Sequence, residues 1–405
     1  MSALKYWIWL SAADVSADAR AAVLLHYGDA ERAFFSAPGD FKNIERLTRR
    51  EAELLEKRDL CLVNPILEKC EMLGLKVISF QDASYPRRLR NIYSPPVALY
   101  VKGRLPAIDE NAVIAVVGTR NASPYGIKMS RQIACDIARC GGIVASGLTR
   151  GIDAAAAEGA LYGGGTVIGV LGTCHSAAAG SLAEEVAARG ALISEYPPLT
   201  PDRKTHFRER NRITAGISLG VVAVEAPEGS NTRLFVAEAA DQGKEIFAVP
   251  GNADAVNSVE TNTMIKDGAH TVTCGWEVLE EFEGLYPEKI RKTVGSAPLE
   301  AFDLPRCAAP QKNYSAPEKQ KPTKKEVDKP KNTGYIDLQE QLKALNEDQL
   351  AIITAIEKDA SHIDDIIERT GLSTARVLSQ LTILEIKGYI RREAGKRILL
   401  NIAKK

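Results

Sequence analysis

The sequence lacks any run of about 18 apolar residues, which a helix needs to cross a membrane. Its first 20 residues hold only a short apolar patch before acidic and polar residues begin, unlike a signal peptide. Net charge is missing as well, because 52 basic residues balance 52 acidic ones. We therefore expect no membrane contact, and any contact with nucleic acid has to come from a local basic cluster.

Metal and redox motifs are also missing. No two of the seven cysteines are spaced as C-x-x-C, which excludes the common zinc and dithiol patterns. The cysteines are scattered through segments predicted to be helices and strands, as is typical of reduced thiols in a cytoplasmic protein. The sequence thus predicts a cytoplasmic protein with no metal site.

Cofactor motifs are absent too. No G-x-G-x-x-G follows a predicted strand, and no G-x-x-x-x-G-K-[ST] occurs anywhere. These gaps disfavour a dinucleotide site and exclude a P-loop. We expect no cofactor, and a site that binds its ligand rather than turning it over.

The most informative stretch of the chain is Val113–Asp153. An apolar run ends at Gly118, a helical pattern follows, and a second apolar run ends at Gly147. This order predicts a β-α-β unit of parallel strands. The runs do not alternate with polar residues, which is typical of a strand covered on both faces.

The two glycine turns of this unit are candidate phosphate sites. Each lies between a strand and the start of a helix, where unpaired backbone N–H groups favour anions. Arg120 and Arg150 add a full positive charge at equivalent places. The pattern predicts an anion site made by both turns.

Strands and helices alternate through residues 112–280. The predicted strands are Val113–Val117, Ile143–Ala145, Thr166–Leu171, Ala191–Ile193, Val221–Val224 and Glu245–Val249. The predicted helices are Ile127–Cys140, Asp153–Tyr162, Ser181–Arg189, Arg208–Ser218 and Leu234–Gln242. This order predicts an α/β fold with an open, doubly wound parallel sheet, whose ligands bind beyond the carboxyl ends of the strands.

A basic loop leads to that edge of the sheet. Its cations are Arg203, Lys204, Arg208, Arg210 and Arg212, with Phe207 among them. Cations with an interleaved aromatic ring suit single-stranded nucleic acid. The alternative is that some arginines pair with Glu195 and Glu225 at neighbouring strand ends. We expect both, because residues 210–212 cannot all face one way on a helix.

Four segments make up the predicted chain. Residues 1–70 form a small helical module of sterile-alpha-motif or helix-hairpin-helix type, and residues 71–285 form the α/β core. Residues 286–339 are rich in Lys and Pro and form a disordered linker. Residues 340–405 predict three helices and a hairpin, which is a winged helix. Whether the winged helix contacts DNA or protein stays open.

These residues resemble the DNA-processing protein A family, DprA, also called Smf. The resemblance is carried by VVGTRNASPYG (116–126), SGLTRGIDAAA (146–156), ISEYPP (193–198), FRERNRITAGIS (207–218), VVAVEA (221–226) and EIFAVPG (245–251). It implies a Rossmann-like core that dimerises and binds single-stranded DNA without catalysis. It also implies protection of incoming DNA in natural transformation, and loading of the recombinase RecA.

Carried over by position, the resemblance also implies the DNA-binding residues. They are Gly118, Thr119, Arg120, Ser123, Tyr125, Gly126, Ser146, Gly147, Arg150, Gly151, Lys204, Phe207, Arg210, Asn211, Arg212 and Ser230, with Asp153 in the second turn. The chain departs from the family pattern at Ala157, in the loop 172–180, and at residues 230–232.

One enzymatic alternative stays open. The segment 227–232 has a faint similarity to the phosphate loop of phosphoribohydrolases, which cleave nucleoside monophosphates on a similar sheet. Two of the three glycines of that loop are absent here. Duplex recognition by the winged helix is a third possibility.

Overall fold

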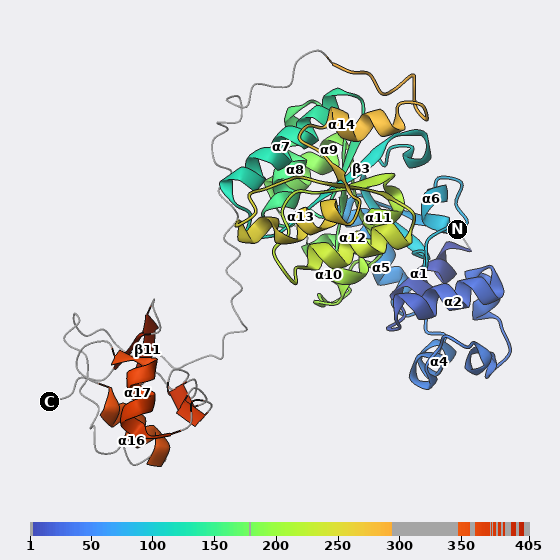
Figure 1. Cartoon of the computed structure of the whole chain (residues 1–405). Helices are drawn as coiled ribbons and strands as arrows, with labels where there is room; N and C mark the ends of the chain where they lie inside the picture. Colours follow the sequence, from blue (N-terminus) through green and yellow to red (C-terminus); the bar gives the residue numbers. More distant parts are fainter. Residues whose placement is uncertain are drawn as a thin grey trace, which may run out of the picture. The chain divides into compact units, whose positions relative to one another are not determined.

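The computed structural model describes residues 3–177, 180–293, 347–356, 361–372, 390–393 and 397–400, with scattered positions between 374 and 384. The chain forms two compact units, Met1–Asn313 and Tyr314–Lys405, which we describe separately. Figure 1 shows the first unit as a sheet covered by helices, with the N-terminal helices gathered beside it. The predicted linker, 286–339, lies largely outside the described residues.

One sheet of nine strands organises the described part of the first unit, in the order β1-β2-β6-β5-β4-β3-β7-β8-β9. The strands are β1 Leu75–Ser79, β2 Ala98–Gly103, β3 Val113–Val117, β4 Ile143–Ser146, β5 Val167–Val170, β6 Ala191–Ser194, β7 Gly220–Ala223, β8 Glu245–Ala248 and β9 His270–Thr271. All six strands predicted for residues 112–280 are present, with ends that differ by at most one residue from the prediction.

The six strands predicted for residues 112–280 pair in parallel, as predicted, and β9 joins them in the same direction. β1 and β2 precede this region and make the sheet mixed, because β2 pairs antiparallel with both β1 and β6. The parallel part winds outward in two directions from β3, with β4 on one side and β7 on the other. A ligand site is therefore expected where β3 and β7 end.

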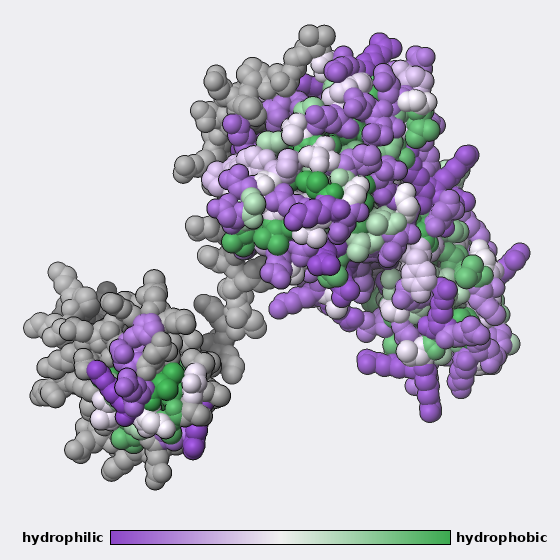
Figure 2. All heavy atoms as spheres, viewed as in Figure 1, coloured by the Kyte–Doolittle hydropathy of each residue, from purple (hydrophilic) through white to green (hydrophobic). Residues whose placement is uncertain are grey.

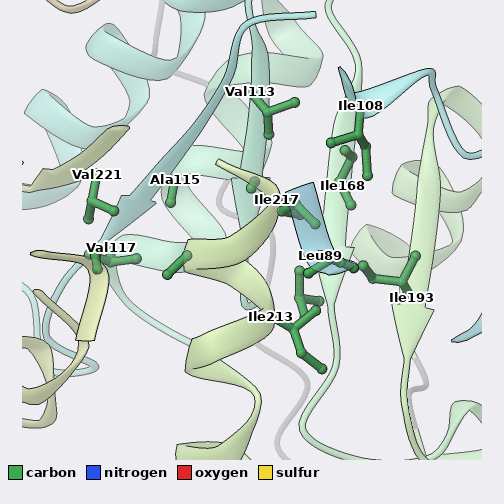
Figure 3. Packing of buried hydrophobic residues seen from close by; sticks show 14 of the residues in the cluster. Leu89, Ile108, Val113, Ala115, Val117, Ile168, Ile193, Ile213, Ile217 and Val221 are labelled. Atoms are coloured by element: carbon green, nitrogen blue, oxygen red, sulfur yellow. The ribbon is translucent and has the colours of Figure 1, made fainter. Parts of the chain in front are cut away.

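Helices cover both faces of the sheet, as the unbroken apolar runs predicted. Along β3, Val113, Ala115 and Val117 pack into one core cluster, while Ile114 and Val116 pack into the other. Figure 3 shows Val113, Ala115 and Val117 on the first face, together with Ile213 and Ile217 of a covering helix.

Four of the five predicted helices of the α/β core begin and end within three residues of the predicted positions, whereas the fifth, Arg208–Ser218, is divided in two at Arg210. The helices of the core are α6 Arg87–Arg90, α7 Pro124–Arg139, α8 Ile152–Tyr162, α9 Ser181–Arg189, α10 His206–Glu209, α11 Asn211–Ile217, α12 Asn231–Asp241, α13 Val259–Lys266 and α14 Trp276–Leu279. The short 3-10 turns are η2 Ile108–Glu110, η3 His175–Ala177, η4 Val256–Ser258 and η5 Glu280–Phe282.

A small helical module precedes the sheet. Its elements are α1 Leu4–Ala12, α2 Ala17–Tyr27, α3 Ala30–Phe34, η1 Asp40–Asn43, α4 Arg49–Glu56 and α5 Val63–Leu73. Ser16 caps α2 by accepting the N–H of Ala19, and Gly28 ends it with a φ of 71°. The core of the module includes Tyr100 of β2, so this core continues onto the sheet. Its sterile-alpha-motif or helix-hairpin-helix type stays a prediction.

The second unit is smaller. Its described elements are α16 Glu347–Ala355, β10 Ser361–His362, α17 Ile363–Thr370, β11 Ile390–Glu393 and β12 Arg397–Leu400. The strands pair in the order β10-β12-β11. Most of the predicted third helix, 374–387, lies outside the described residues. Val377, Leu381 and Leu384 are buried against the helices, as their spacing predicted.

Over the described residues, no helix has the length and apolarity to span a membrane. Figure 2 shows a largely hydrophilic surface over the first unit, broken by small apolar patches. The cysteines among the described residues are free thiols, and most of them are buried.

Candidate nucleic-acid interface

The loops after β3 and β7 meet at the place where the sheet reverses direction. The backbone N–H of Thr119 donates to the carbonyl oxygen of Glu225 at 2.8 Å. A Cβ on Gly118 would lie only 2.9 Å from that same oxygen. The close approach of the two loops therefore requires glycine at position 118.

The two predicted glycine turns also lie against each other. The N–H of Ile152 donates to the carbonyl oxygen of Thr119 at 3.2 Å, and Arg150 Nη2 donates to Asn121 Oδ1 at 3.0 Å. The two turns, which are separate in the sequence, are therefore in direct contact in the structure. Arg120 and Arg150 are both exposed there.

We expect Gly151→Ala to destabilise this junction. Gly151 has a φ of 84°, and a Cβ would clash with the backbone oxygens of Thr119 and Arg120. A strained left-handed residue costs about 1–3 kcal/mol. Urea unfolding should show a loss of that order, whereas Gly164→Ala (also at positive φ, with open space around it) should lose less. Equal losses would contradict the role of the clash.

The sequence predicted that unpaired N–H groups at the N-termini of α7 and α8 bind phosphate, but carboxylates of the chain already lie at these helix ends. At α7, Glu225 accepts the backbone N–H of Ser123 at 2.9 Å and its hydroxyl, and Ser123 Oγ accepts the N–H of Gly126 at 3.1 Å. At α8, buried Asp153 lies in the first turn and accepts the hydroxyl of Thr149 at 2.9 Å. Two carboxylates of the chain already occupy the N-terminal ends of these helices.

The sequence predicted that Glu225 pairs with an arginine of the basic loop, and the structure gives it other partners. It accepts Asn257 Nδ2 at 3.1 Å in addition to Ser123, and among the described residues no arginine pairs with it. Tyr125 is half-exposed at 44% and donates its hydroxyl to Pro250 O at 2.8 Å. The free positive charge at this edge therefore comes from side chains rather than from helix ends.

Two arginines of the basic loop are buried. Arg210 donates to Val170 O at 2.6 Å and lies 3.6 Å from Asp153. Its guanidinium lies against Gly147, where a Cβ would clash with it. Arg212 pairs with Glu195 at 2.5 Å. These arginines join the loops to one another and do not reach a ligand, because their charges are already paired inside.

The aromatic residue of the loop meets Arg120. The Arg120 guanidinium lies over the ring of half-buried Phe207, 5.4 Å from its centroid. A Cβ on Gly172 would lie 2.9 Å from Phe207 Cα, so the loop after β5 supports Phe207 from behind. Lys204 is exposed on the segment that leads into Phe207. We call the surface formed by Arg120, Arg150, Lys204 and Phe207 the rim.

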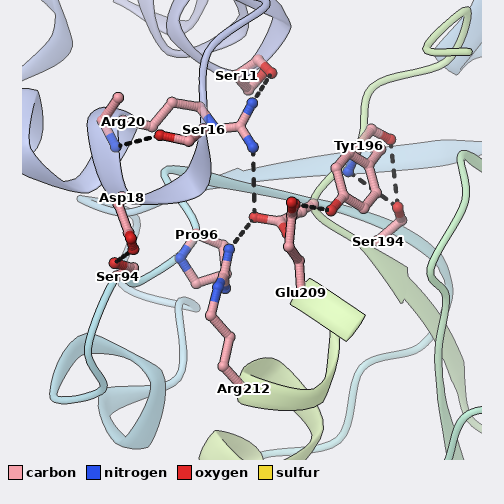
Figure 4. A network of polar contacts seen from close by, with 12 residues as sticks. Ser11, Ser16, Asp18, Arg20, Ser94, Pro96, Ser194, Tyr196, Glu209 and Arg212 are labelled. Carbon is pink, nitrogen blue, oxygen red and sulfur yellow. Dashed lines mark hydrogen bonds and ion pairs between the residues drawn. The ribbon is translucent and has the colours of Figure 1, made fainter. Parts of the chain in front are cut away.

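The helical module is connected to the same loop, which the sequence did not predict. Arg20 of α2 lies 4.0 Å from Glu195, the partner of Arg212. Figure 4 shows Arg20 and Arg212 approaching from opposite sides, with Tyr196 and Glu209 beside them. The Tyr196 hydroxyl donates to Glu209 at 2.8 Å. At the exposed end, Arg203 pairs with Asp14 at 2.9 Å.

The pKa values of two buried acids of this region shift in opposite directions. Burial alone would raise the pKa of Glu195, but Arg212 and Arg20 together bring it below its ordinary value. At Asp153, burial outweighs the attraction of Arg210 and raises the pKa. Arg212 and Arg20 therefore stabilise the ionised form of Glu195.

The remaining predicted residues lie elsewhere. Ser146 is buried and donates to Asp153 O at 2.7 Å, which fixes the second turn. Ser230 precedes α12, and its Oγ is buried without a partner. Asn211 points away from the rim and lines a separate pocket with Arg208.

Comparison with known families assigns the core. The model of DNA recombination-mediator protein A matches residues 76–283. The chain belongs to the DprA/Smf family. The model of the DprA winged helix domain matches residues 338–396, which confirms the predicted C-terminal fold.

Individual DprA/Smf proteins are similar over much of their length. DprA of Bacillus subtilis is 34% identical over 212 residues, covering 51% of this chain and 71% of that protein. Smf of Escherichia coli is 32% identical over 328 residues, covering 79% and 76%. The X-ray structure of DprA from Streptococcus pneumoniae aligns with a TM-score of 0.61 at 29% identity, covering 69% of this chain and 98% of that one.

Proposed function

We propose that the rim binds single-stranded DNA without catalysing a reaction. The observation that carries the proposal is the contact between Arg120 and Phe207, which puts a cation and an aromatic ring on one surface. Arg120, Arg150 and Lys204 bind phosphates and release counterions, while the ring of Phe207 stacks on a base. The relatives' name, DNA processing protein, supports this assignment.

The buried arginines have a supporting role in this proposal. Arg210 and Arg212 position the loop that carries Lys204 and Phe207, through their pairs with Asp153 and Glu195. The glycines and serines of both turns allow the loops to pack closely. Of the residues predicted to bind DNA, only the four rim residues contact it directly in this proposal.

We extend the proposal to the biological role. The family model describes a recombination mediator, which supports delivery of bound single strands to a RecA recombinase and protection of DNA in natural transformation. We also propose that the protein acts in the cytoplasm, as a homodimer formed through its α/β core. Light scattering of the purified chain and RecA-dependent strand exchange test these points.

Arg120→Ala and Lys204→Ala should each weaken binding to oligo-dT. The loss of one phosphate contact reduces the slope of log affinity against log salt by about 0.7 for a single strand. Fluorescence anisotropy across a salt series measures both quantities. Arg49→Ala is the matched control, because Arg49 is an exposed arginine of α4 in the N-terminal module, paired only with Glu53.

Two results would contradict the proposal. Binding that stays unchanged in both rim variants would remove the rim from DNA recognition. Release of adenine from AMP by the purified protein would favour the phosphoribohydrolase alternative instead.

A further inference from the structure

A polar pocket, separate from the rim, lies on the face of the core covered by α11 and α12. It has a volume of about 570 Å³, within the range of small-molecule sites. Its lining includes Tyr93, Arg208, Asn211, Gln242 and Lys244. None of the four rim residues lines it. At the start of α11, the side chains of Arg210 and Arg212 turn inward to their carboxylates, while Asn211 between them lines the pocket.

One amide side chain of this pocket has an unsatisfied atom. Gln242 donates Nε2 to Arg212 O at 3.2 Å, but its Oε1 is buried without a partner. Asn211, which is 8% exposed, lines the same pocket. A buried amide oxygen is normally satisfied, so Gln242 Oε1 indicates a missing hydrogen-bond donor at this pocket.

One end of the pocket carries uncompensated positive charge. Lys244 is partly buried beside Arg88, and its Nζ donates to Gly216 O at 3.4 Å. Burial, and then the charge of Arg88, lower the pKa of Lys244 to about 8. Arg88 is held in place by Ile217 O at 3.2 Å and Asn111 O at 3.0 Å. A bound anion would relieve the repulsion between these two cations.

The other end is mixed in charge. Glu238 and Asp241 lie there with Arg208, and burial raises the pKa of Glu238. Tyr93 is 62% exposed at the mouth, with the Arg46 guanidinium 5.0 Å from its ring centroid. Carboxylates and amides accept and donate hydrogen bonds to a base or a sugar, whereas they would repel a second phosphate.

We propose that this pocket binds one nucleoside phosphate, as a site separate from the rim. The phosphate lies at Lys244, and the base and sugar lie among Asn211, Gln242 and Glu238. A free nucleotide and the phosphorylated end of a DNA strand present this same chemistry. The pocket does not need the rim, so either site can be tested without the other.

Calorimetry with dTMP, thymidine and inorganic phosphate tests the chemistry. We expect dTMP to bind more tightly than either fragment, because each fragment leaves one end of the pocket unfilled. Lys244→Gln should weaken dTMP binding by about tenfold or more, because it removes a hydrogen bond to the charged phosphate. Asn211→Ala should weaken it by about two- to tenfold, because it removes a hydrogen bond to the neutral base or sugar. Lys266→Gln, an exposed lysine of α13, is the matched control.

Oligo-dT with a 5′-phosphate, a 3′-phosphate or two hydroxyl ends distinguishes the two sources. If one terminal phosphate raises the affinity for oligo-dT and Lys244→Gln removes that increase, the pocket binds the end of a strand. If dTMP binds tightly and neither terminal phosphate changes the affinity, the pocket binds a free nucleotide. Phosphate binding as tightly as dTMP would overturn the proposal, as would no binding of dTMP and no effect of either terminal phosphate. Binding of hydroxyl-ended oligo-dT reports on the rim separately, and circular dichroism checks that the variants are folded.

Discussion

Glu195→Ala is expected to lower the free energy of unfolding by about 3–5 kcal/mol, the usual loss when one partner of a buried ion pair is removed. Glu195 is 5% exposed, and Arg212 lies 2.5 Å from its carboxylate. Arg20 approaches the same oxygen from the helical module at 4.0 Å. Without the carboxylate, two buried guanidinium groups face each other with no counter-charge. Urea unfolding followed by circular dichroism measures the loss.

An exposed pair provides the control for this variant. Glu53 and Arg49 are 3.0 Å apart on α4, with side chains 56% and 90% exposed. Glu53→Ala should cost less than about 0.5 kcal/mol, because solvent screens such pairs. A loss for Glu195→Ala no larger than that of Glu53→Ala would mean that the network does not stabilise the fold.

The stability contributed by Glu195 should depend on pH in a defined direction. Because its pKa in the folded chain lies below the ordinary 4.5, its charged form is favoured by folding, and the full contribution is present above 4.5. The contribution is lost as the pH falls through the folded pKa. Glu195→Gln should therefore flatten the acid limb of the stability curve below about pH 4.5.

The central strands could be predicted because their sequence pattern is local. Val113–Val117 and residues 246–249 are continuous apolar runs, and burial on both faces requires such runs. The pairing of β2 with β6 could not be predicted in the same way. β6 was predicted, but its adjacency to β2 depends on contacts between residues about 90 positions apart, such as Val101 with Ile193.

The candidate site was predicted in part, for a similar reason. The glycine turns follow from strand ends, and helix geometry predicted that residues 210–212 do not all face one way. The Glu225 carboxylate at the start of α7 did not follow, because Ser123 and Glu225 are 102 positions apart. Nor did the Arg20 contact, which required knowing where the helical module docks.

Phe207→Ala is expected to weaken single-strand binding about 5- to 150-fold, since stacking on an aromatic side chain contributes about 1–3 kcal/mol per base. The ring is held between Gly172 and the Arg120 guanidinium. A base can reach the ring face once Arg120 moves to a phosphate. Phe207→Tyr keeps the ring and should retain most of the affinity, whereas Phe207→Leu should not.

Salt dependence separates the two components of the rim. Stacking releases no counterions, so Phe207→Ala should lower affinity at every salt concentration with an unchanged slope, while Arg120→Ala reduces the slope. Because Arg120 lies over Phe207, the double variant should lose less than the two single losses combined. Anisotropy titrations of oligo-dT with both single variants and the double variant measure this coupling. A reduced slope in Phe207→Ala would show that the ring does not stack on a base, and strictly additive losses would show that Arg120 and Phe207 bind independently of each other.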